Sequence, residues 1–244
     1  MSKIVLTNVR LLTGGADLTS VSNKVEVTTK VEEKETTNYG SEGYKELLGG
    51  LASAEVAGEG QWEAGDAGKV DDAAWTQLGG VGAWSIGPVG ASVGDLAYAT
   101  RMLRCDYKLG DQVGEVAPWT SGGKSAWPLV RGQFAHPPGT ARTADGNGTG
   151  LNLGAVATGK RLYAALHVLS ASGTTPSLTA RVESSADNTF GSPTTRLTFT
   201  AATAGGGQIL RTDASAITDA WWRIAWTITG TSPSFLFAAT LGVQ

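Results

Sequence analysis

Apolar and polar residues alternate along much of this chain, which is the pattern of β-strands with one buried face. The longest example is residues 24–32, where Val25, Val27 and Val31 share one face and charged residues occupy the other. We expect a strand whose valine face is buried. Similar stretches predict strands at residues 4–12, 52–62, 129–134, 162–169, 177–183, 195–200, 207–211, 222–229 and 235–241.

Helical signals are few. Residues 42–48 predict one short helix, because Ser41 can cap its first turn and the glycines at 49 and 50 would end it. Residues 71–78 predict another, with an acidic residue at the cap and two glycines after it. Residues 96–107 fit either a helix or a strand. The sequence therefore predicts a mainly β protein with one or two short helices.

A stretch rich in proline, glycine and small polar residues interrupts the strand pattern at residues 139–150. It holds no large apolar side chain, which is typical of a linker. We therefore expect a β domain over residues 1–138 and a second domain over residues 151–244. About seven short strands in the second domain predict a β-sandwich of immunoglobulin-like or jelly-roll type.

Composition narrows the class of protein. Charged residues make up 17% of the 244 residues, below the roughly 25% of typical soluble domains. A sparsely charged surface fits a subunit packed against copies of itself, and it fits a neutral monomer equally well. The single cysteine, Cys105, excludes an internal disulfide and lies in an apolar stretch, so we expect a buried thiol. We see no secretory signal and no apolar run of membrane-spanning length.

Negative charge is concentrated near the N-terminal end. Residues 24–72 hold five lysines and twelve acidic residues, whereas the whole chain has a net charge of only −3. A polyanion-binding protein should instead show a basic stripe. The pattern argues against stable nucleic-acid binding, although an acidic run is most often a solvated face.

Motifs that resemble catalytic or phosphate-binding sites are incomplete. The Gly-Gly-Lys-Ser sequence at 122–125 lacks the earlier glycine of a phosphate-binding loop, since position 118 is proline. Ser85 lies in Ala-Trp-Ser-Ile-Gly, which lacks the first glycine of a nucleophile elbow. Of the two histidines, His136 falls in the proline-rich segment, and His167 in an apolar stretch where we expect a hydrogen-bonded sheet residue.

Metal-binding patterns are incomplete too. Residues 145–150 copy the start of a calcium loop, but Val156 stands where the loop needs a bidentate acid. Two isolated histidines and one cysteine make no zinc site. Nothing selects a catalytic pair among the carboxylates, so we expect no enzyme, no catalytic residue, no cofactor and no metal.

Tryptophan is unusually frequent, with eight spread over both halves of the chain. Three roles stay open for them: core packing, subunit-interface anchors and a sugar-stacking platform. In Trp221-Trp222, neighbours on a strand point to opposite faces, so we expect one to be buried and the other exposed or at a contact. Trp222 should share its face with Ile224 and Trp226.

The order of segments in the first half resembles the major tail proteins, or tail tube proteins, of siphophages that infect actinobacteria. The segments that carry the resemblance are 17–22, 35–41, 43–55 and 58–62, followed by 94–98, 113–116 and 129–132. The resemblance implies a tube-forming β-sandwich or barrel with a flanking helix, and it places the second domain on the outside of the tube.

The family also implies a function. Its members form rings, usually hexamers, that stack helically into a tube through which genome DNA passes without specific binding; a trimer of two fused tube-like domains is the alternative. The implied partners are the chain itself and other tail proteins (tape measure, terminator and distal tail protein), with no membrane. The implied location is the virion tail, after assembly in the host cytoplasm.

Two groups of residues follow as hypotheses within that function. Acids facing the lumen would repel phosphates and let DNA slide; the candidates are Glu26, Glu32, Glu33 and Glu35. A loop could reach the neighbouring ring through Tyr39, Tyr44, Leu47 and Leu48. The competing function is a carbohydrate-binding or adhesin module that grips a glycan through Trp221 or Trp222, and the third is a hydrolase with an unidentified carboxylate pair.

Overall fold

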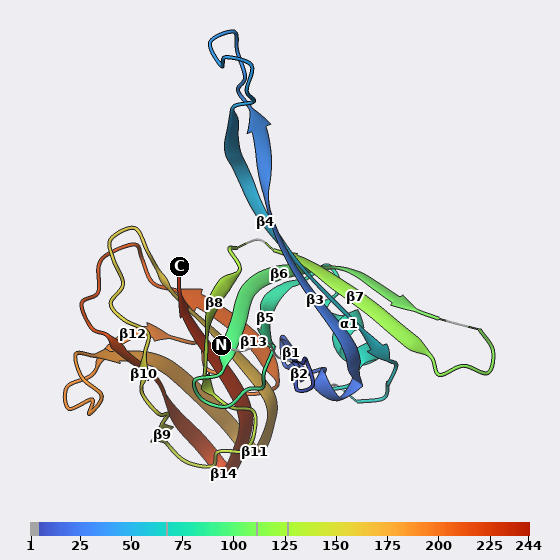
Figure 1. Cartoon of the computed structure of the whole chain (residues 1–244). Helices are drawn as coiled ribbons and strands as arrows, with labels where there is room; N and C mark the ends of the chain where they lie inside the picture. The colour runs from blue at the N-terminus through green and yellow to red at the C-terminus, as the bar shows by residue number, and fades with distance from the viewer. Residues whose placement is uncertain (1–4, 67, 111, 126) are drawn as a thin grey trace.

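A computed structural model describes residues 5–66, 68–110, 112–125 and 127–244. The protein is mainly β, as the sequence predicts, and every strand pair is antiparallel (Figure 1). The elements are β1 (Arg10–Thr13), β2 (Ala16–Asp17), the 3-10 turn η1 (Thr19–Val21), β3 (Ser22–Glu35), β4 (Leu47–Gln61), α1 (Val70–Gln77), β5 (Val81–Gly87), β6 (Leu96–Leu109), β7 (Pro118–Ser125), β8 (Val130–His136), β9 (Gly146–Asn147), β10 (Leu151–Asn152), β11 (Leu162–Ser185), β12 (Thr194–Thr198), β13 (Gly206–Arg211) and β14 (Trp221–Val243).

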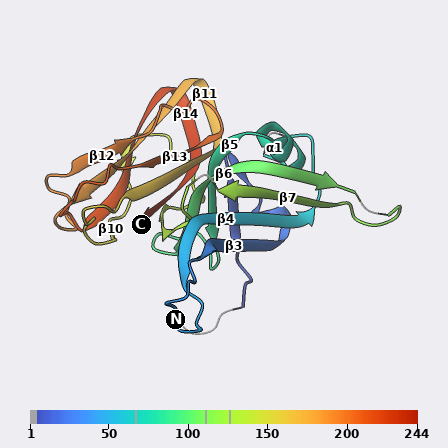
Figure 2. The same ribbon diagram turned by 90° about the horizontal axis from the view of Figure 1, so that it is seen from above.

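The N-terminal unit is built from two layers of one continuous sheet, and the two layers share β6. The first half of β6 pairs with β5 and β8, and its second half pairs with β7, which continues to β4 and β3. A bulge between Arg104 and Asp106 marks the change of direction. Val56 and Trp119 from one layer pack against Leu11 and Trp84 from the other. Figure 2 shows β3, β4, β7 and β6 side by side, with α1 beyond them.

The C-terminal unit is a long two-stranded ribbon folded over on itself. β11 and β14 pair along almost their whole lengths. Gly173 and Gly230 have φ angles of 114° and 123°, a region that glycine adopts at little cost, and the ribbon bends there. The two halves of the ribbon then face each other across a core of Leu166, Val182 and Phe237. β13 extends one layer, whereas β12, β9 and β10 extend the other.

One strand joins the two units. β8 pairs with β6 on one side and with β14 on the other, so a single sheet runs through both units. The predicted linker at residues 139–150 lies along the C-terminal unit. Arg142 forms a β-bridge with Phe235, and the Asp145 carboxylate accepts a hydrogen bond from the backbone N–H of Ile228 (2.8 Å).

The two helix predictions have different outcomes. The helix predicted at residues 71–78 is confirmed as α1. The helix predicted at residues 42–48 is wrong: Glu42 and Gly43 have positive φ angles of 48° and 87°, and β4 starts at Leu47. The two glycines expected to end that helix are strand residues, with Gly49 paired to Glu33. The ambiguous residues 96–107 form β6.

The strand predicted at residues 24–32 is confirmed as part of β3, but its burial pattern differs from the prediction. Val25 and Val27 pack against the N-terminal core, whereas Val31 is exposed. The reason is that β3 and β4 continue beyond the body of the protein. The strand predicted at residues 4–12 begins only at Arg10, and residues 1–4 lie outside the described residues.

Within the described part of the chain, no helix has both the length and the apolar character needed to cross a membrane.

Candidate assembly surface

The most prominent feature of the surface is a β-hairpin that stands out from the body (Figure 1). β3 and β4 pair from Ser22 and Gly60 at the base to Glu35 and Leu47 near the end. β4 also pairs with β7, but only over Glu55–Gln61. Residues 28–35 and 47–54 therefore form a ribbon of two strands, which we call the projecting hairpin together with the turn between them. Among the described strands, neither outer edge of this ribbon has a partner.

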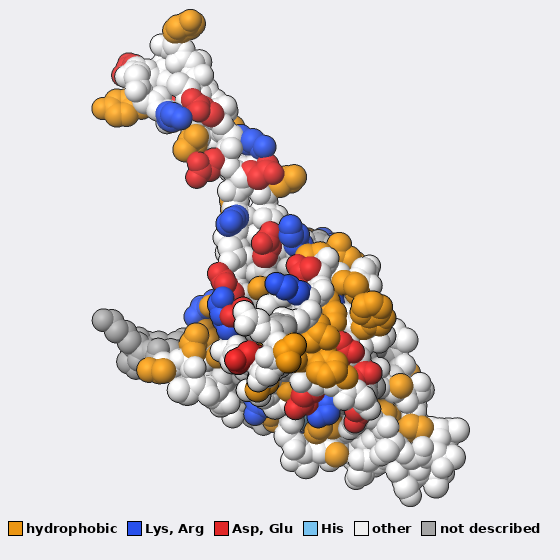
Figure 3. All heavy atoms as spheres, turned by 90° about the vertical axis from the view of Figure 1, so that its right-hand side faces the viewer, with side chains coloured by type: hydrophobic (Ala, Val, Ile, Leu, Met, Phe, Trp, Pro, Cys, Tyr) orange, Lys and Arg blue, Asp and Glu red, His pale blue; other side chains and the backbone are white. Residues whose placement is uncertain are grey.

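Large apolar side chains are exposed along the projecting hairpin. Tyr39 is fully exposed, and the exposed fractions of Tyr44, Leu47 and Leu48 are 80%, 54% and 61%. These are the four residues predicted to contact a neighbouring ring. Leu51 is also exposed, at 77%, and was not among the predicted contacts. Figure 3 shows hydrophobic side chains at the end of the hairpin and acidic and basic ones along it.

The turn at the end of the hairpin is held by local hydrogen bonds. The Asn38 side chain accepts a bond from the N–H of Gly40 (2.8 Å), and the Ser41 hydroxyl accepts one from the N–H of Asn38 (3.1 Å). The N–H of Tyr44 bonds to the carbonyl of Ser41 (2.9 Å). These Asx-type bonds replace the helix that the sequence suggested, because Asn and Ser side chains compete for backbone groups in turns.

The four acids predicted to line a lumen lie on both faces of β3. Side chains alternate along a strand, so Glu26 and Glu32 share the outer face, whereas Glu33 and Glu35 lie on the opposite one. Lysines accompany most of them. Lys34 contacts Glu32 (2.7 Å), and Lys45 contacts Glu35 (3.2 Å). Glu33 has no ion pair in the described part of the chain.

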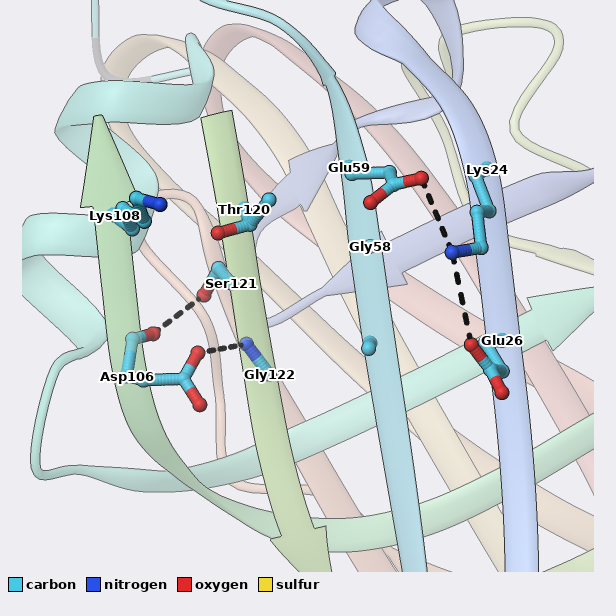
Figure 4. A pocket seen from close by; sticks show the side chains of 10 residues that line it. Lys24, Glu26, Gly58, Glu59, Asp106, Lys108, Thr120, Ser121 and Gly122 are labelled. Atoms are coloured by element: carbon cyan, nitrogen blue, oxygen red, sulfur yellow. Dashed lines mark hydrogen bonds and ion pairs between the residues drawn. The ribbon is translucent and has the colours of Figure 1, made fainter. Parts of the chain in front are cut away.

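The outer face of the sheet β3-β4-β7-β6 carries a shallow groove with a volume of about 380 Å³ (Figure 4). On one wall, Lys24 lies between Glu26 (3.8 Å) and Glu59 (3.2 Å). On the other wall, Asp106 accepts a bond from the N–H of Gly122 (2.6 Å). The face is thus polar, with acidic and basic side chains interleaved rather than an unbroken acidic surface.

A buried arginine fixes the opposite face of this sheet. Arg104 donates to the hydroxyls of Ser121 (2.5 Å) and Thr13 (3.0 Å) and to the side-chain oxygen of Gln77 on α1 (3.1 Å). Its guanidinium also lies 4.6 Å from the ring centroid of Trp84. Burial lowers the pKa of Arg104 to about 10, because none of these partners carries a negative charge. One arginine therefore ties together β1, β6, β7 and α1.

Tryptophans occupy different environments. The prediction for Trp222 is confirmed, since it is buried with Ile224 and Trp226. Trp221, expected to be exposed or at a contact, is half-buried on the opposite face, and its role at a contact stays a prediction. The indole N–H of Trp222 donates to the carbonyl of Gly154 (2.9 Å). A glycan platform could therefore use only Trp221 of this pair. Trp75 on α1 is 70% exposed.

The structure brings Ser85 and His167 together, which the sequence did not reveal. The Nε2 atom of His167 lies 2.8 Å from the Ser85 hydroxyl. Both side chains are fully buried, so no substrate can reach the serine. His167 is a hydrogen-bonded sheet residue, as predicted. His136 is buried as well, with Nδ1 3.0 Å from the carbonyl of Phe237.

The described residues contain no group of three or more His, Cys, Asp or Glu side chains that could hold a metal ion. The expectation of a buried Cys105 is wrong: the side chain is exposed, because it lies on the outer face of β6 at the bulge.

No family model and no curated protein matches this sequence. Among solved structures, the chain is similar to a protein in the virion of a native gene transfer agent particle, with 16% identity, 52% of this chain and 97% of that chain covered, and a TM-score of 0.44. It is similar to the SPP1 tail tube protein, with 13% identity, 53% and 78% covered, and a TM-score of 0.44. It is also similar to the SPP1 Dit protein, with 11% identity, 97% and 99% covered, and a TM-score of 0.36.

Proposed function

We propose that this chain is a structural subunit of a phage tail that assembles with copies of itself into stacked rings, forming the tail tube. The observation that carries the proposal is the projecting hairpin, which has an apolar end and two edges without a partner among the described strands. An isolated two-stranded ribbon is marginally stable in water, and open edges are templates for pairing with another chain. Neighbouring copies would pair with the open strand edges and cover the apolar end of the hairpin.

Ring formation follows from the edges of the sheet β3-β4-β7-β6. β3 pairs with β4 alone, and β6 beyond Arg104 pairs with β7 alone, within the described residues. Joining β3 of one copy to the end of β6 in the next would be a head-to-tail contact, which closes into a ring when the rotation permits. A hexamer, or a trimer of duplicated units, would close in this way and bury every edge.

The polar outer face of this sheet would line the tube. Lys24 and Lys124 each contact carboxylates, Lys124 with Glu55 at 3.8 Å, so their charges are compensated locally. DNA binds proteins chiefly through unpaired Lys and Arg that displace its counterions. Lys108, which lines the same groove, has no ion pair among the described residues, so the compensation is partial. A wall on which most lysines are paired with carboxylates would let DNA pass in transit without holding it. The tape measure, terminator and distal tail proteins would be further partners, and the C-terminal unit would face outwards.

The sequence resemblance to major tail proteins of siphophages agrees with this proposal. The similar solved structures include a tail tube, but at TM-scores below 0.5 that likeness is too distant to carry the argument. In this function the protein acts by assembly and catalyses no reaction. The competing function is carbohydrate binding through Trp221 or Trp222. Trp222 is buried, so only Trp221 of these two residues could contact a glycan.

Electron microscopy of the purified protein at high concentration tests the proposal, with and without other tail proteins as initiators. Rings or tubes are the expected result. Discrete monomers under all conditions, together with binding on a glycan array, would replace the proposal with the carbohydrate-binding function. Turnover of a polysaccharide would replace it with a hydrolase.

A further inference from the structure

Two arginines from different units converge on one tryptophan at the junction of the N-terminal and C-terminal units. Arg101 lies on β6 and Arg211 ends β13, and their guanidinium carbons lie 5.6 and 4.5 Å from the ring centroid of Trp127. Tyr163 of β11 packs edge-on against the same ring, with centroids 5.9 Å apart. We call Arg101 and Arg211, which stack on Trp127, the arginine pair.

The tryptophan is held firmly by its backbone. The carbonyl of Trp127 accepts a hydrogen bond from the Thr100 hydroxyl (3.0 Å), and its N–H donates to the Ser125 hydroxyl (3.1 Å). Thr100 is buried in β6. These two bonds hold the backbone of Trp127 in place, so its ring gives both guanidinium groups one common stacking surface.

The arginine pair has no carboxylate partner among the described residues of its own chain. Among the described residues, neither Arg101 nor Arg211 makes an ion pair or a side-chain hydrogen bond, whereas Arg181 and Arg223 share Glu183 at 2.7 Å each. The two guanidinium groups lie within about 10 Å of each other, and stacking on an exposed indole compensates little of their charge. Guanidinium donors in a fixed geometry are suited to a carboxylate.

The projecting hairpin carries the opposite excess. It holds five carboxylates and three lysines. Ion pairs with Glu32 and Glu35 already occupy Lys34 and Lys45. Three exposed carboxylates remain, against one lysine; they belong to Glu33, Glu42 and Glu46. Each copy of the chain has one such hairpin and one arginine pair, so a head-to-tail contact would satisfy every copy with none left over.

We propose that the arginine pair receives the free carboxylates of the projecting hairpin from a neighbouring copy. The inference rests on the proposed function, because it requires copies to assemble, and it specifies which surfaces meet. It also gives the C-terminal unit a part in assembly, since Arg211 belongs to that unit. Assembly then requires β13 and β6 to keep their relative positions, because each strand carries one of the two arginines.

Charge reversal with rescue tests this contact. The double variant R101E/R211E should raise the protein concentration needed for assembly at least tenfold, measured by light scattering and electron microscopy. The variant R131E/K160E is the matched control, because it makes the same change in net charge at two other exposed positions, and it should assemble like the wild type. Adding E33K, E42K and E46K to R101E/R211E should restore assembly. Urea unfolding of each monomer checks that it is folded, and R101Q/R211Q replaces the double variant if that one is not.

The outcomes separate this inference from the proposed function. Failure of the wild-type chain to assemble contradicts the proposed function itself. Assembly of R101E/R211E at the wild-type concentration overturns the contact, and so does loss of assembly without rescue by the hairpin lysines. Titration with inorganic phosphate or a DNA oligonucleotide tests whether the arginine pair binds another anion. The fluorescence of Trp127, taken as the difference between the wild-type monomer and the Trp127→Phe variant, reports binding. Tight binding of either, combined with failed rescue, would assign the arginine pair to that anion instead.

Discussion

His167 Nε2 lies 2.8 Å from the hydroxyl of Ser85, although 82 residues separate them in the chain. The contact is part of a directed chain of hydrogen bonds between the two units. The carbonyl of Gly14 can only accept, so His167 donates from Nδ1 (2.7 Å). Burial lowers the pKa of His167 to about 4, so the ring is neutral near pH 7 and its Nε2 accepts from Ser85. The Ser85 oxygen then accepts from Thr240 (3.2 Å). A neutral imidazole is therefore built into the junction.

The first prediction concerns pH. Burial lowers the pKa of both His167 and His136 to about 4, whereas an unfolded histidine titrates near 6.5. The unfolded chain therefore takes up protons first as the pH falls. Stability should be complete above about pH 6.5 and decline down to about pH 4, with His167 contributing about 3 kcal/mol of the loss. Urea unfolding at intervals across this range measures the slope, and His167→Gln should reduce it by the share of one histidine. An unchanged slope in that variant would contradict the assignment.

The adjacent tryptophans give a second prediction. Trp222→Ala should destabilise the protein by about 3–5 kcal/mol, because it leaves a cavity in the C-terminal core and frees the carbonyl of Gly154. Trp221→Ala, on the half-buried face, should cost clearly less. Urea unfolding of the two variants makes the comparison. Equal losses would mean that the strand register of β14 differs from the one described.

The strand that joins the two units supplies a third prediction. A Cβ atom on Gly132 would lie 2.0 Å from the carbonyl oxygen of Leu241, so Gly132→Ala must push β8 away from β14. We expect a loss of more than about 2 kcal/mol, in the range of overpacking. Gly139→Ala is the matched control, since a Cβ there meets nothing within 4 Å. Thermal or urea unfolding measures both, and a neutral Gly132→Ala would contradict the close approach of the strands.

The fourth prediction concerns the face proposed to line the tube. Replacing Glu26 and Glu59 with lysine removes both carboxylates that contact Lys24 and creates a cluster of unpaired positive charge. Assembled tubes of this variant should retain DNA in a salt-dependent way, and DNA ejection should be impaired. Filter binding at two salt concentrations measures retention. The control variant, D187K/D213K, makes the same change in net charge at two exposed positions of the C-terminal unit and should bind no more DNA than the wild type. DNA retention equal to that of the control would place this face elsewhere in the assembly.

Alternation and turn chemistry were sufficient to predict the mainly β class, α1 and the opposite faces of Trp221 and Trp222. The same rules failed at residues 42–48, because Ser41 caps a turn as readily as a helix and only the pairing of Gly49 with Glu33 decides between them. Strand alternation also could not show that Val31 lies beyond the body of the protein, since burial depends on where the partner strands stop.

Contacts between segments that are far apart in the chain could not be predicted from the sequence. Ser85 and His167 were each noticed, but nothing local indicates that β5 and β11 meet. Arg101, Trp127 and Arg211 carry no motif at all, and their convergence depends on β8 joining the two units. The four apolar residues at the end of the hairpin were predicted as contacts on a loop, and whether they contact a neighbouring copy stays a prediction.

The most direct measurement is sedimentation velocity of the wild-type chain beside a variant in which residues 36–46 are replaced by Asn-Gly. That change keeps β3 paired with β4 and leaves Leu47 and Leu48 in place, but it removes Tyr39 and Tyr44 from the end of the hairpin. The wild type should form large particles as its concentration rises, and the shortened variant should stay monomeric with the same unfolding midpoint. Assembly of the shortened variant at the wild-type concentration would contradict the role of the hairpin.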